Sequence, residues 1–475
     1  MNAGMRWGTL CGVAAGALWG LVFVVPLLLP DYPAPLLAFG RYLAFGLITL
    51  PLAWWDRTAL AQLRRADWLQ ALLKPGATAP LQSDDAVRGA VRDLLRHGGY
   101  KPTGRGKPAS EYLVRAAGDG TLGITASTPA IDLSKTVEWK DGVVKKLNAG
   151  VAALLKKAKV KVIKGWAEFS DAKTCTVKTD DGDIRITAEH VILATGSEPV
   201  ELPFLPFGGD VISSTEALSL PEVPKKLVVV GGGYIGLELG IAFRKLGAEV
   251  AIVEMAERIL PLYDKALTDP VAKWLEKHGV QLLLGARAGG FGDGKLNVTD
   301  KDGNPMQLDA DKVLVTVGRR PRTKGWGLET MGVAMDGPFV KIDKRCATSM
   351  KNVWAVGDLT GEPMLAHKGS AQGEVVAEII AGHDRVFDPV TIAAVCFTEP
   401  EIVSAGLGPD DVKGRDDVIQ AVFPFAAIGR ALAIEAGEDG GFVRVIASKS
   451  DHRLLGIQAV GQHVSELSNS FAQML

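Results

Sequence analysis

The chain has 475 residues, with 53 lysines and arginines against 54 aspartates and glutamates and a net charge of −1. This length allows roughly two to four domains, and the near-neutral balance gives no electrostatic case for nucleic-acid binding. The sequence shows neither a metal site nor a local redox disulfide, because its cysteines are far apart and none forms a CxxC or Cys-x4-Cys pair. The four cysteines are Cys11, Cys175, Cys346 and Cys396.

The first 55 residues are much more apolar than the rest. Residues 8–30 contain no charged side chain. This run is long enough to cross a bilayer, which takes about 20 residues per span. A second apolar segment, residues 35–55, carries only Arg41 and is followed by a basic run. The positive-inside rule then predicts a transmembrane helical hairpin over residues 8–55, anchoring the protein at the cytoplasmic face of the membrane. A cleaved signal peptide or a purely cytoplasmic protein are the alternatives.

Residues 75–122 form a charged segment of different character. Val87, Val91, Leu94 and Leu95 recur at helical spacing, which predicts one soluble amphipathic helix. The basic loop over residues 101–107 could contact RNA, but a solvated loop is the favoured interpretation.

Beyond residue 123 the pattern alternates between helices and strands, which is typical of an α/β protein. A helix is predicted around residues 141–160, with one apolar face. Asp181 and Gly182 mark a β-hairpin. Further buried strands end at residues 194, 317 and 356, and strands dominate again after residue 387. The expected apolar face of the helix consists of Val143, Val144, Leu147, Val151, Leu154 and Leu155.

Residues 225–254 have the pattern of a dinucleotide-binding β-α-β unit. An apolar strand leads into Gly231, Gly233 and Gly236, and a helix and a second strand ending at Glu254 follow. The first glycine permits the tight turn, the second lets the backbone approach a pyrophosphate, and the third allows close helix–strand packing. Glu254 is expected to accept hydrogen bonds from the adenosine ribose. A protein that binds the 2′-phosphate of NADP is expected to have arginine directly after this position. Met255 stands there instead, which favours NAD over NADP.

Six motifs occur in order along this part of the chain: ATGSEP, GGGYIGLELG, VGRRP, NVWAVGDL, MLAHKGSAQGE and AVCFTEPEIVSAGL. On these motifs, residues 123–475 resemble the dihydrolipoamide dehydrogenase family of flavin-dependent disulfide oxidoreductases. The resemblance implies a fold with two dinucleotide-binding domains and a C-terminal α+β dimerisation domain. The FAD half is expected to be incomplete.

The resemblance also implies domain boundaries. They are a remnant of the FAD-binding domain at 123–222, an NAD-binding domain at 223–322, a return to the FAD domain and central region at 323–385, and a C-terminally truncated dimerisation domain at 386–475. Residues 1–74 precede them as the membrane hairpin and resemble the first two helices of drug/metabolite transporter permeases. Residues 75–120 resemble a fragment of the B3/B4-type domain of phenylalanyl-tRNA synthetase β subunits.

Binding residues follow from the same resemblance. NAD(H) contacts are implied for Gly231, Gly233, Tyr234, Ile235, Gly236, Glu238, Glu254 and Gly318. FAD contacts are implied for Thr195, Gly196, Ser197, Asp358, Leu365, Ala366 and His367. The family context further implies a homodimer, and as partner a lipoyl-bearing acyltransferase of 2-oxoacid dehydrogenase complexes.

Residues that the family's chemistry requires are not found in this sequence. The first glycine-rich FAD loop, the Cys-x4-Cys redox pair and the C-terminal His–Glu segment are missing, so no catalytic residue is assigned. The histidines are interpreted as structural. The leading hypothesis is therefore a dihydrolipoamide dehydrogenase-family chain that is inactive in this form. The alternatives are a non-catalytic, membrane-tethered NAD-binding fusion and a permease fragment joined to an enzyme remnant.

Overall fold

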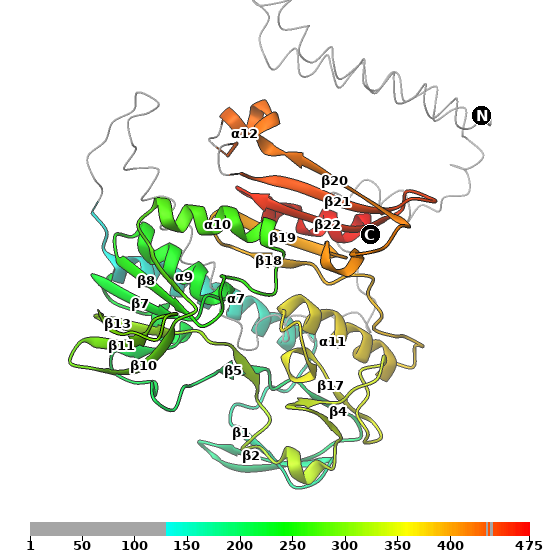
Figure 1. Ribbon diagram of the computed structural model, residues 1–475. Coiled ribbons are helices and arrows are strands. Elements are labelled where there is room, and N and C mark those ends of the chain that lie inside the picture. The colour runs from blue at the N-terminus through cyan, green and yellow to red at the C-terminus, as the bar shows by residue number, and fades with distance from the viewer. Residues whose placement is uncertain (1–129, 434–435, 438–439) are drawn as a thin grey trace, which may run out of the picture. The chain divides into compact units, whose positions relative to one another are not determined.

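The computed structural model describes residues 130–433, 436–437 and 440–475 (Figure 1). The predicted membrane hairpin and the charged segment of residues 75–122 lie outside these described residues. Within them, no helix combines the length and the apolar character that crossing a bilayer requires.

The described chain begins with a long helix, α7 (Leu133–Lys157), which confirms the helix predicted in this region. Asp132 caps its start, since the side chain accepts a hydrogen bond from the Lys135 amide at 3.1 Å. A three-stranded antiparallel sheet follows, in the order β1-β2-β3. Its hairpin turns at Asp181 and Gly182 as predicted. The strands are β1 (Trp166–Phe169), β2 (Thr174–Thr179) and β3 (Gly182–Thr187).

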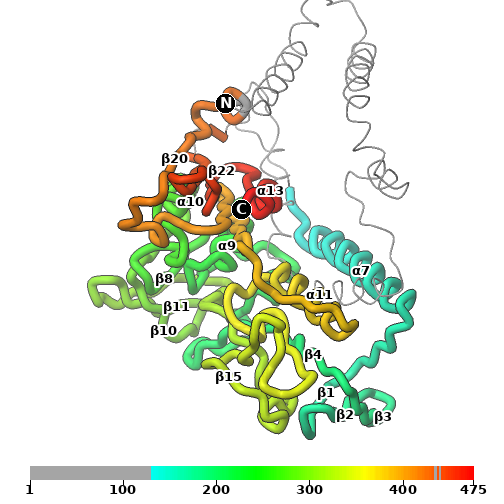
Figure 2. The backbone as a smooth tube through the Cα atoms, turned by 90° about the vertical axis from the view of Figure 1, so that its right-hand side faces the viewer, coloured from blue at the N-terminus to red at the C-terminus, as the bar shows by residue number. Residues whose placement is uncertain are grey.

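Most of the predicted apolar face of α7 is exposed to solvent. Only Leu133 and Leu155 are buried in this helix, whereas Val143, Leu147 and Leu154 are 40%, 44% and 42% exposed. The first turns pack on the neighbouring domain, where Lys140 Nζ donates to the Leu218 carbonyl at 2.9 Å. Figure 2 shows α7 in cyan at the margin of the backbone trace.

A parallel strand pair forms the centre of the FAD-like part of the chain. Strand β4 (Val191–Leu193) pairs in parallel with β17 (Val353–Ala355), although more than 150 residues separate them. Two connecting strands, β5 (Ser197–Pro199) and β14 (Arg319–Pro321), pair antiparallel. The remaining elements here are η2 (Leu328–Met331), β15 (Met335–Asp336), β16 (Phe339–Val340), η3 (Gly357–Thr360) and α11 (Ala366–Ile380).

The central domain is built on a five-stranded parallel sheet in the order β6-β13-β7-β8-β9. Four of the five residues of β7 are buried. This is expected of a parallel strand that is covered on both faces, and each buried Val or Leu contributes about 1.5–3 kcal/mol. The strands are β6 (Val211–Ile212), β7 (Lys226–Val230), β8 (Glu249–Glu254), β9 (Gln281–Leu284) and β13 (Lys312–Val315).

Helices and a second sheet complete this domain. A three-stranded antiparallel sheet, β10-β11-β12, follows β9. The helices are α8 (Ser214–Ala217), α9 (Tyr234–Lys245) and α10 (Lys265–Lys277), and the strands are β10 (Arg287–Gly292), β11 (Lys295–Thr299) and β12 (Pro305–Asp309).

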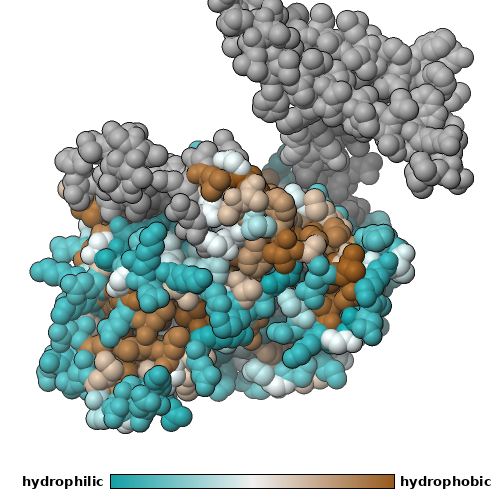
Figure 3. Space-filling model, turned by 45° about the horizontal axis from the view of Figure 1, so that its top comes forward, coloured by the Kyte–Doolittle hydropathy of each residue, from teal (hydrophilic) through white to brown (hydrophobic). Residues whose placement is uncertain are grey.

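The C-terminal domain is a five-stranded antiparallel sheet in the order β18-β19-β22-β21-β20. Strand β20 lies at its edge with six of seven residues exposed, and Figure 3, which brings the top of the molecule forward, shows apolar patches on that face. The elements are β18 (Ala394–Cys396), β19 (Glu401–Gly406), η4 (Asp410–Val412), β20 (Val418–Pro424), η5 (Phe425–Ala427), α12 (Gly429–Ala433), β21 (Phe442–Ser448), β22 (Leu454–Gly461), η6 (Val464–Leu467) and α13 (Ser468–Met474).

Two ion pairs with little solvent exposure join the central and C-terminal domains. Lys245 Nζ lies 2.6 Å from Glu399 Oε2, and the side chains are 11% and 13% exposed. Arg444 Nη1 lies 2.8 Å from Asp264 Oδ2. Breaking such a pair by removing one partner is costly, because the remaining charge stays largely desolvated.

Candidate functional site

The glycine loop between β7 and α9 is compact on its protein side. Gly231 has φ of +109°, and a Cβ atom there would lie 2.6 Å from the Thr316 carbonyl oxygen. A Cβ on Gly236 would lie 2.3 Å from the Gly231 carbonyl oxygen. Since real Cβ atoms do not approach so closely, both positions require glycine. The predicted turn and the predicted close packing of helix on strand are therefore present.

The same loop is open on its outer side. Gly233 caps the start of α9, and no protein atom lies within 4 Å of the place where its Cβ would stand. The N-terminal end of a helix favours a negatively charged group, because the first amides have no partner within the helix. The loop therefore fits a dinucleotide pyrophosphate, which can approach the backbone only where no side chain intervenes.

Glu254 lies at the end of β8, directly beside this loop. Its Oε2 accepts a hydrogen bond from the Gly232 amide at 2.5 Å, and its Oε1 accepts one from the Ala256 amide at 2.7 Å. These two amides fix the carboxylate, while each oxygen keeps a lone pair for a further donor. Met255, next in the chain, is 71% exposed. The predicted ribose acceptor is thus positioned next to the glycine loop.

The other residues predicted to contact NAD are distributed around this loop. Tyr234 begins α9 and is partly exposed, whereas Ile235 packs against the hydrophobic core of the domain. Gly318 follows β13 with φ of +129°, and its carbonyl accepts from the Val200 amide at 3.1 Å.

Glu238 is placed differently from the loop residues. It is only 6% exposed, and its Oε1 accepts a hydrogen bond from the Phe397 amide of the C-terminal domain at 3.0 Å. Close by, Tyr263 and Cys396 hydrogen-bond each other. Burial raises the pKa of Tyr263 well above its usual range and that of Cys396 to about 12. This buried polar cluster connects α9 with β18, and the sequence pattern gave no sign of it.

The residues predicted to contact FAD gather where β4 and β17 end. In parallel sheets, ligands bind at the carboxyl ends of the strands. Gly196 has φ of +72° in the turn after β4. The Ser197 hydroxyl donates to Asp358 Oδ2 at 2.5 Å, across 161 positions of sequence. The Thr195 hydroxyl donates to the Arg322 carbonyl at 2.9 Å. The structure thus brings the two predicted flavin motifs into contact, and an acceptor such as Asp358 suits a polyol hydroxyl.

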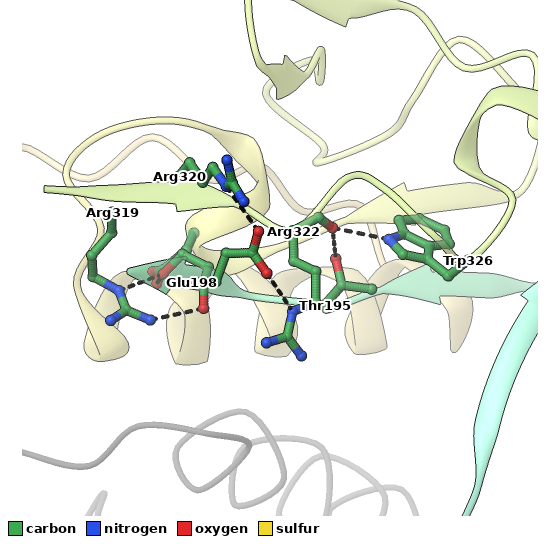
Figure 4. A network of polar contacts seen from close by, with 8 residues as sticks. Thr195, Glu198, Arg319, Arg320, Arg322 and Trp326 are labelled. Carbon is green, nitrogen blue, oxygen red and sulfur yellow. Dashed lines mark hydrogen bonds and ion pairs between the residues drawn. The ribbon is translucent and has the colours of Figure 1, made fainter. Parts of the chain in front are cut away.

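Two arginines pair with Glu198, the residue after Ser197 in β5. Figure 4 shows Glu198 between Arg320 and Arg322. Its Oε1 lies 2.8 Å from Arg320 Nε and its Oε2 lies 3.5 Å from Arg322 Nε. The Thr195 hydroxyl and the indole of Trp326 both donate to the carbonyl of Arg322. These contacts hold the strands β5 and β14 together.

The start of α11 contributes the last predicted flavin residues. Leu365 caps the helix, and Ala366 and His367 form its first turn. His367 Nε2 donates to the Ala393 carbonyl at 2.9 Å, and burial lowers the pKa of His367. Lys368, which the sequence reasoning missed, is buried, donates to the Gly361 carbonyl, and has a pKa lowered by burial.

The described cysteines and histidines form no redox or metal centre in residues 130–433, 436–437 and 440–475. Cys175, Cys346 and Cys396 are all buried and free. Burial raises the pKa of Cys346 to about 12, which is the opposite of the lowered pKa of a reactive thiolate. In the same residues, no three His, Cys, Asp or Glu side chains are grouped to hold a metal ion.

Comparison with known proteins agrees with this geometry. The pyridine nucleotide-disulphide oxidoreductase family matches residues 97–373, and the dimerisation domain of the same family matches residues 392–475. The first match begins ahead of the boundary predicted at residue 123.

Curated relatives carry the resemblance further. The dihydrolipoyl dehydrogenase of Pseudomonas aeruginosa is 56% identical over 371 residues, which is 77% of this chain and 80% of the relative. That of Geobacillus stearothermophilus is 43% identical over 364 residues, which is 76% of this chain and 77% of the relative.

Solved structures share the fold. LpdA from Mycobacterium tuberculosis superposes with a TM-score of 0.73 at 24% identity, covering 82% of this chain and 90% of that protein. The HOCl-induced flavoprotein disulfide reductase RclA from Escherichia coli gives 0.70 at 24% identity with the same coverage. The chain therefore belongs to the pyridine nucleotide-disulphide oxidoreductases, a family dependent on FAD and NAD, and within it to the dihydrolipoamide dehydrogenases.

Proposed function

We propose that this chain binds NAD(H) at the loop of residues 231–236 and retains the polyol-binding part of a flavin site at Asp358. The reaction of its relatives, as their name states, is the dehydrogenation of dihydrolipoyl groups. The observation that carries the proposal is the open space at Gly233, which adjoins the start of α9 and the fixed carboxylate of Glu254.

Each binding residue has a defined part in this proposal. The amides at the start of α9 would hold the pyrophosphate, and Glu254 would accept the ribose hydroxyls. Asp358 would bind the flavin polyol, with Ser197 hydrogen-bonded to it and the first turn of α11 beside it. A bound flavin would carry two electrons between a dithiol and NAD.

The complete dithiol reaction is not expected from these 475 residues alone. Thiol–disulfide exchange needs two sulfurs within bonding reach and a substantial thiolate fraction. The described cysteines Cys175, Cys346 and Cys396 are buried and form no disulfide, and burial keeps the thiols of Cys346 and Cys396 protonated at neutral pH. We therefore propose that the chain binds its nucleotide but does not oxidise dihydrolipoamide unaided.

Two assays with purified full-length chain test this proposal. Titration with NADH, followed by nucleotide fluorescence, should give saturable binding, and adding NAD and dihydrolipoamide with excess FAD should produce no NADH. Absence of NADH binding would contradict the nucleotide site. Sustained NADH production would contradict the proposed inactivity and establish the chain as a working dehydrogenase.

Location and partners extend the proposal. We propose that residues 8–55 anchor the chain at the cytoplasmic face of the membrane and that the dimerisation domain forms a homodimer. A lipoyl-bearing acyltransferase of 2-oxoacid dehydrogenase complexes is the proposed partner. Recovery of the chain in the soluble fraction without detergent would contradict the anchor, and a monomer in light scattering would contradict the dimer.

A further inference from the structure

Three side chains form a hydrogen-bonded relay across the strands that connect the two nucleotide-binding parts. Arg319 Nε donates to Ser197 Oγ at 2.8 Å, and its second terminal nitrogen donates to the Ser197 carbonyl at 2.7 Å. The Ser197 hydroxyl in turn donates to Asp358 Oδ2 at 2.5 Å. The relay therefore runs from β14 through β5 to the turn after β17.

The direction of this relay is fixed by chemistry. A guanidinium group can only donate, so Ser197 Oγ must accept from Arg319 with a lone pair. The single hydroxyl proton is then left for Asp358. Both bonds involve an ionised group, which makes them roughly twice as strong as neutral hydrogen bonds.

We infer that Arg319 is a positioning residue, which holds the Asp358 carboxylate in place for a flavin polyol by fixing the Ser197 hydroxyl between them. This inference rests on the flavin site of the proposed function. The Ser197 hydroxyl donates to Asp358 Oδ2, so the relay holds one oxygen and leaves Oδ1 to accept a ligand hydroxyl.

The neighbouring cations do not take the place of Arg319. Arg320 and Arg322 are both paired with Glu198, and Lys368 Nζ donates to the carbonyl of Gly361. Arg319 alone among these contacts both the hydroxyl and the carbonyl of Ser197. A lysine in its position would carry the charge but not this planar, two-pronged geometry.

The strand pair that carries the relay also adjoins a residue predicted to contact NAD. Gly318, which is predicted to contact NAD, immediately precedes Arg319 in the chain, and its carbonyl accepts from the Val200 amide. The same short strand pair therefore holds the backbone at Gly318 and, through the relay, the carboxylate of Asp358.

The test compares FAD affinity among variants of the full-length chain by quenching of flavin fluorescence. Arg319→Met and Ser197→Ala should each weaken binding about tenfold. The double variant should bind no more weakly than either single variant, because both remove the same relay. Ser197→Thr keeps the hydroxyl and should retain the affinity. The matched control, Arg320→Met, removes only the ion pair with Glu198 and should change the affinity less than twofold.

Wild-type affinity in Arg319→Met, or fully additive losses in the double variant, would overturn the inference. A second readout does not depend on flavin: amide hydrogen exchange at residues 357–360 should be faster in Arg319→Met and Ser197→Ala and unchanged in Arg320→Met. If the wild-type chain takes up no flavin, the proposed flavin site is wrong. The amide hydrogen exchange rates then still test whether Arg319 and Ser197 hold residues 357–360 in place. Equal exchange in all four proteins would refute it. Arg319→Lys, a milder change, should show the same direction of effect as Arg319→Met.

Discussion

Replacing Gly236 and Gly240 of α9, and Gly233 at its N-cap, one at a time by alanine should separate folding from nucleotide binding. At Gly236 the new Cβ would lie 2.3 Å from the Gly231 carbonyl oxygen and 2.5 Å from Thr316 Oγ1. At Gly240, one turn further, its closest neighbours would be 3.5–3.9 Å away, which is ordinary van der Waals contact. At Gly233 it would meet no protein atom within 4 Å.

The expected magnitudes follow from these distances. Overpacking costs about 1–3 kcal/mol, whereas alanine in a helix interior gains about 0.5–1 kcal/mol over glycine. Gly236→Ala should therefore lose roughly 1–2 kcal/mol of stability, and Gly240→Ala should gain up to about 1 kcal/mol. For a domain of about 100 residues, 1 kcal/mol shifts the melting temperature by about 4–8 °C. Gly233→Ala should leave the melting temperature unchanged but weaken NADH binding about tenfold, or about 1.4 kcal/mol.

Thermal unfolding and NADH titration of the three variants provide the assay. Gly240→Ala is the matched control, since it makes the same substitution in the same helix without a steric clash. The reasoning would be refuted if Gly236→Ala and Gly240→Ala shifted the melting temperature alike. It would also be refuted if Gly233→Ala bound NADH as tightly as the wild-type chain, because the space there would then not be used by the nucleotide.

Three further predictions concern charged and titratable groups. Glu254→Ala should weaken NADH binding at least fivefold, since it frees the Gly232 amide and removes the ribose acceptor. Fluorescence titration with NADH measures this affinity. An unchanged affinity would refute the assignment of Glu254 to the ribose. Arg444→Met should cost about 3 kcal/mol in urea unfolding by leaving Asp264 unpaired, and adding Asp264→Leu should restore much of that loss. Burial lowers the pKa of His367 below its ordinary value, so on acidification the unfolded chain takes up the proton first and stability falls as the pH drops below about 6.5. His367→Gln should flatten this dependence in urea unfolding between pH 7.5 and 5.5.

Much of the nucleotide site could be predicted from sequence because its determinants are local. Gly231, Gly233 and Gly236 occupy one continuous β-α-β unit, and backbone geometry dictates each of them. Glu254 ends the next strand, so its place beside the loop follows from the parallel pairing of β7 with β8. The strands around Asp358 were likewise identified, because short buried strands with terminal turns leave a clear pattern.

Other features depend on contacts between distant segments, which local patterns do not encode. The spacing of Val143 and Leu147 predicts their helix, α7, but does not show that both side chains stay partly exposed. An apolar stripe shows only that a helix suits a partner, not that the partner is present. The contact of Glu238 with Phe397 arises for a similar reason, since it depends on how two domains pack.

The paired strands β5 and β14 make the central domain an insertion with adjoining ends. The chain leaves the FAD-like part through β5 and returns through β14, and the Val200 amide donates to the Gly318 carbonyl at 3.1 Å. A segment whose two ends are hydrogen-bonded can be excised or exchanged without stretching the remainder. Residues 200–318 thus constitute a cassette. A short linker from residue 199 to residue 319 would close the chain after its removal. Because the two ends of the cassette are adjacent, the isolated nucleotide-binding unit could also be circularly permuted.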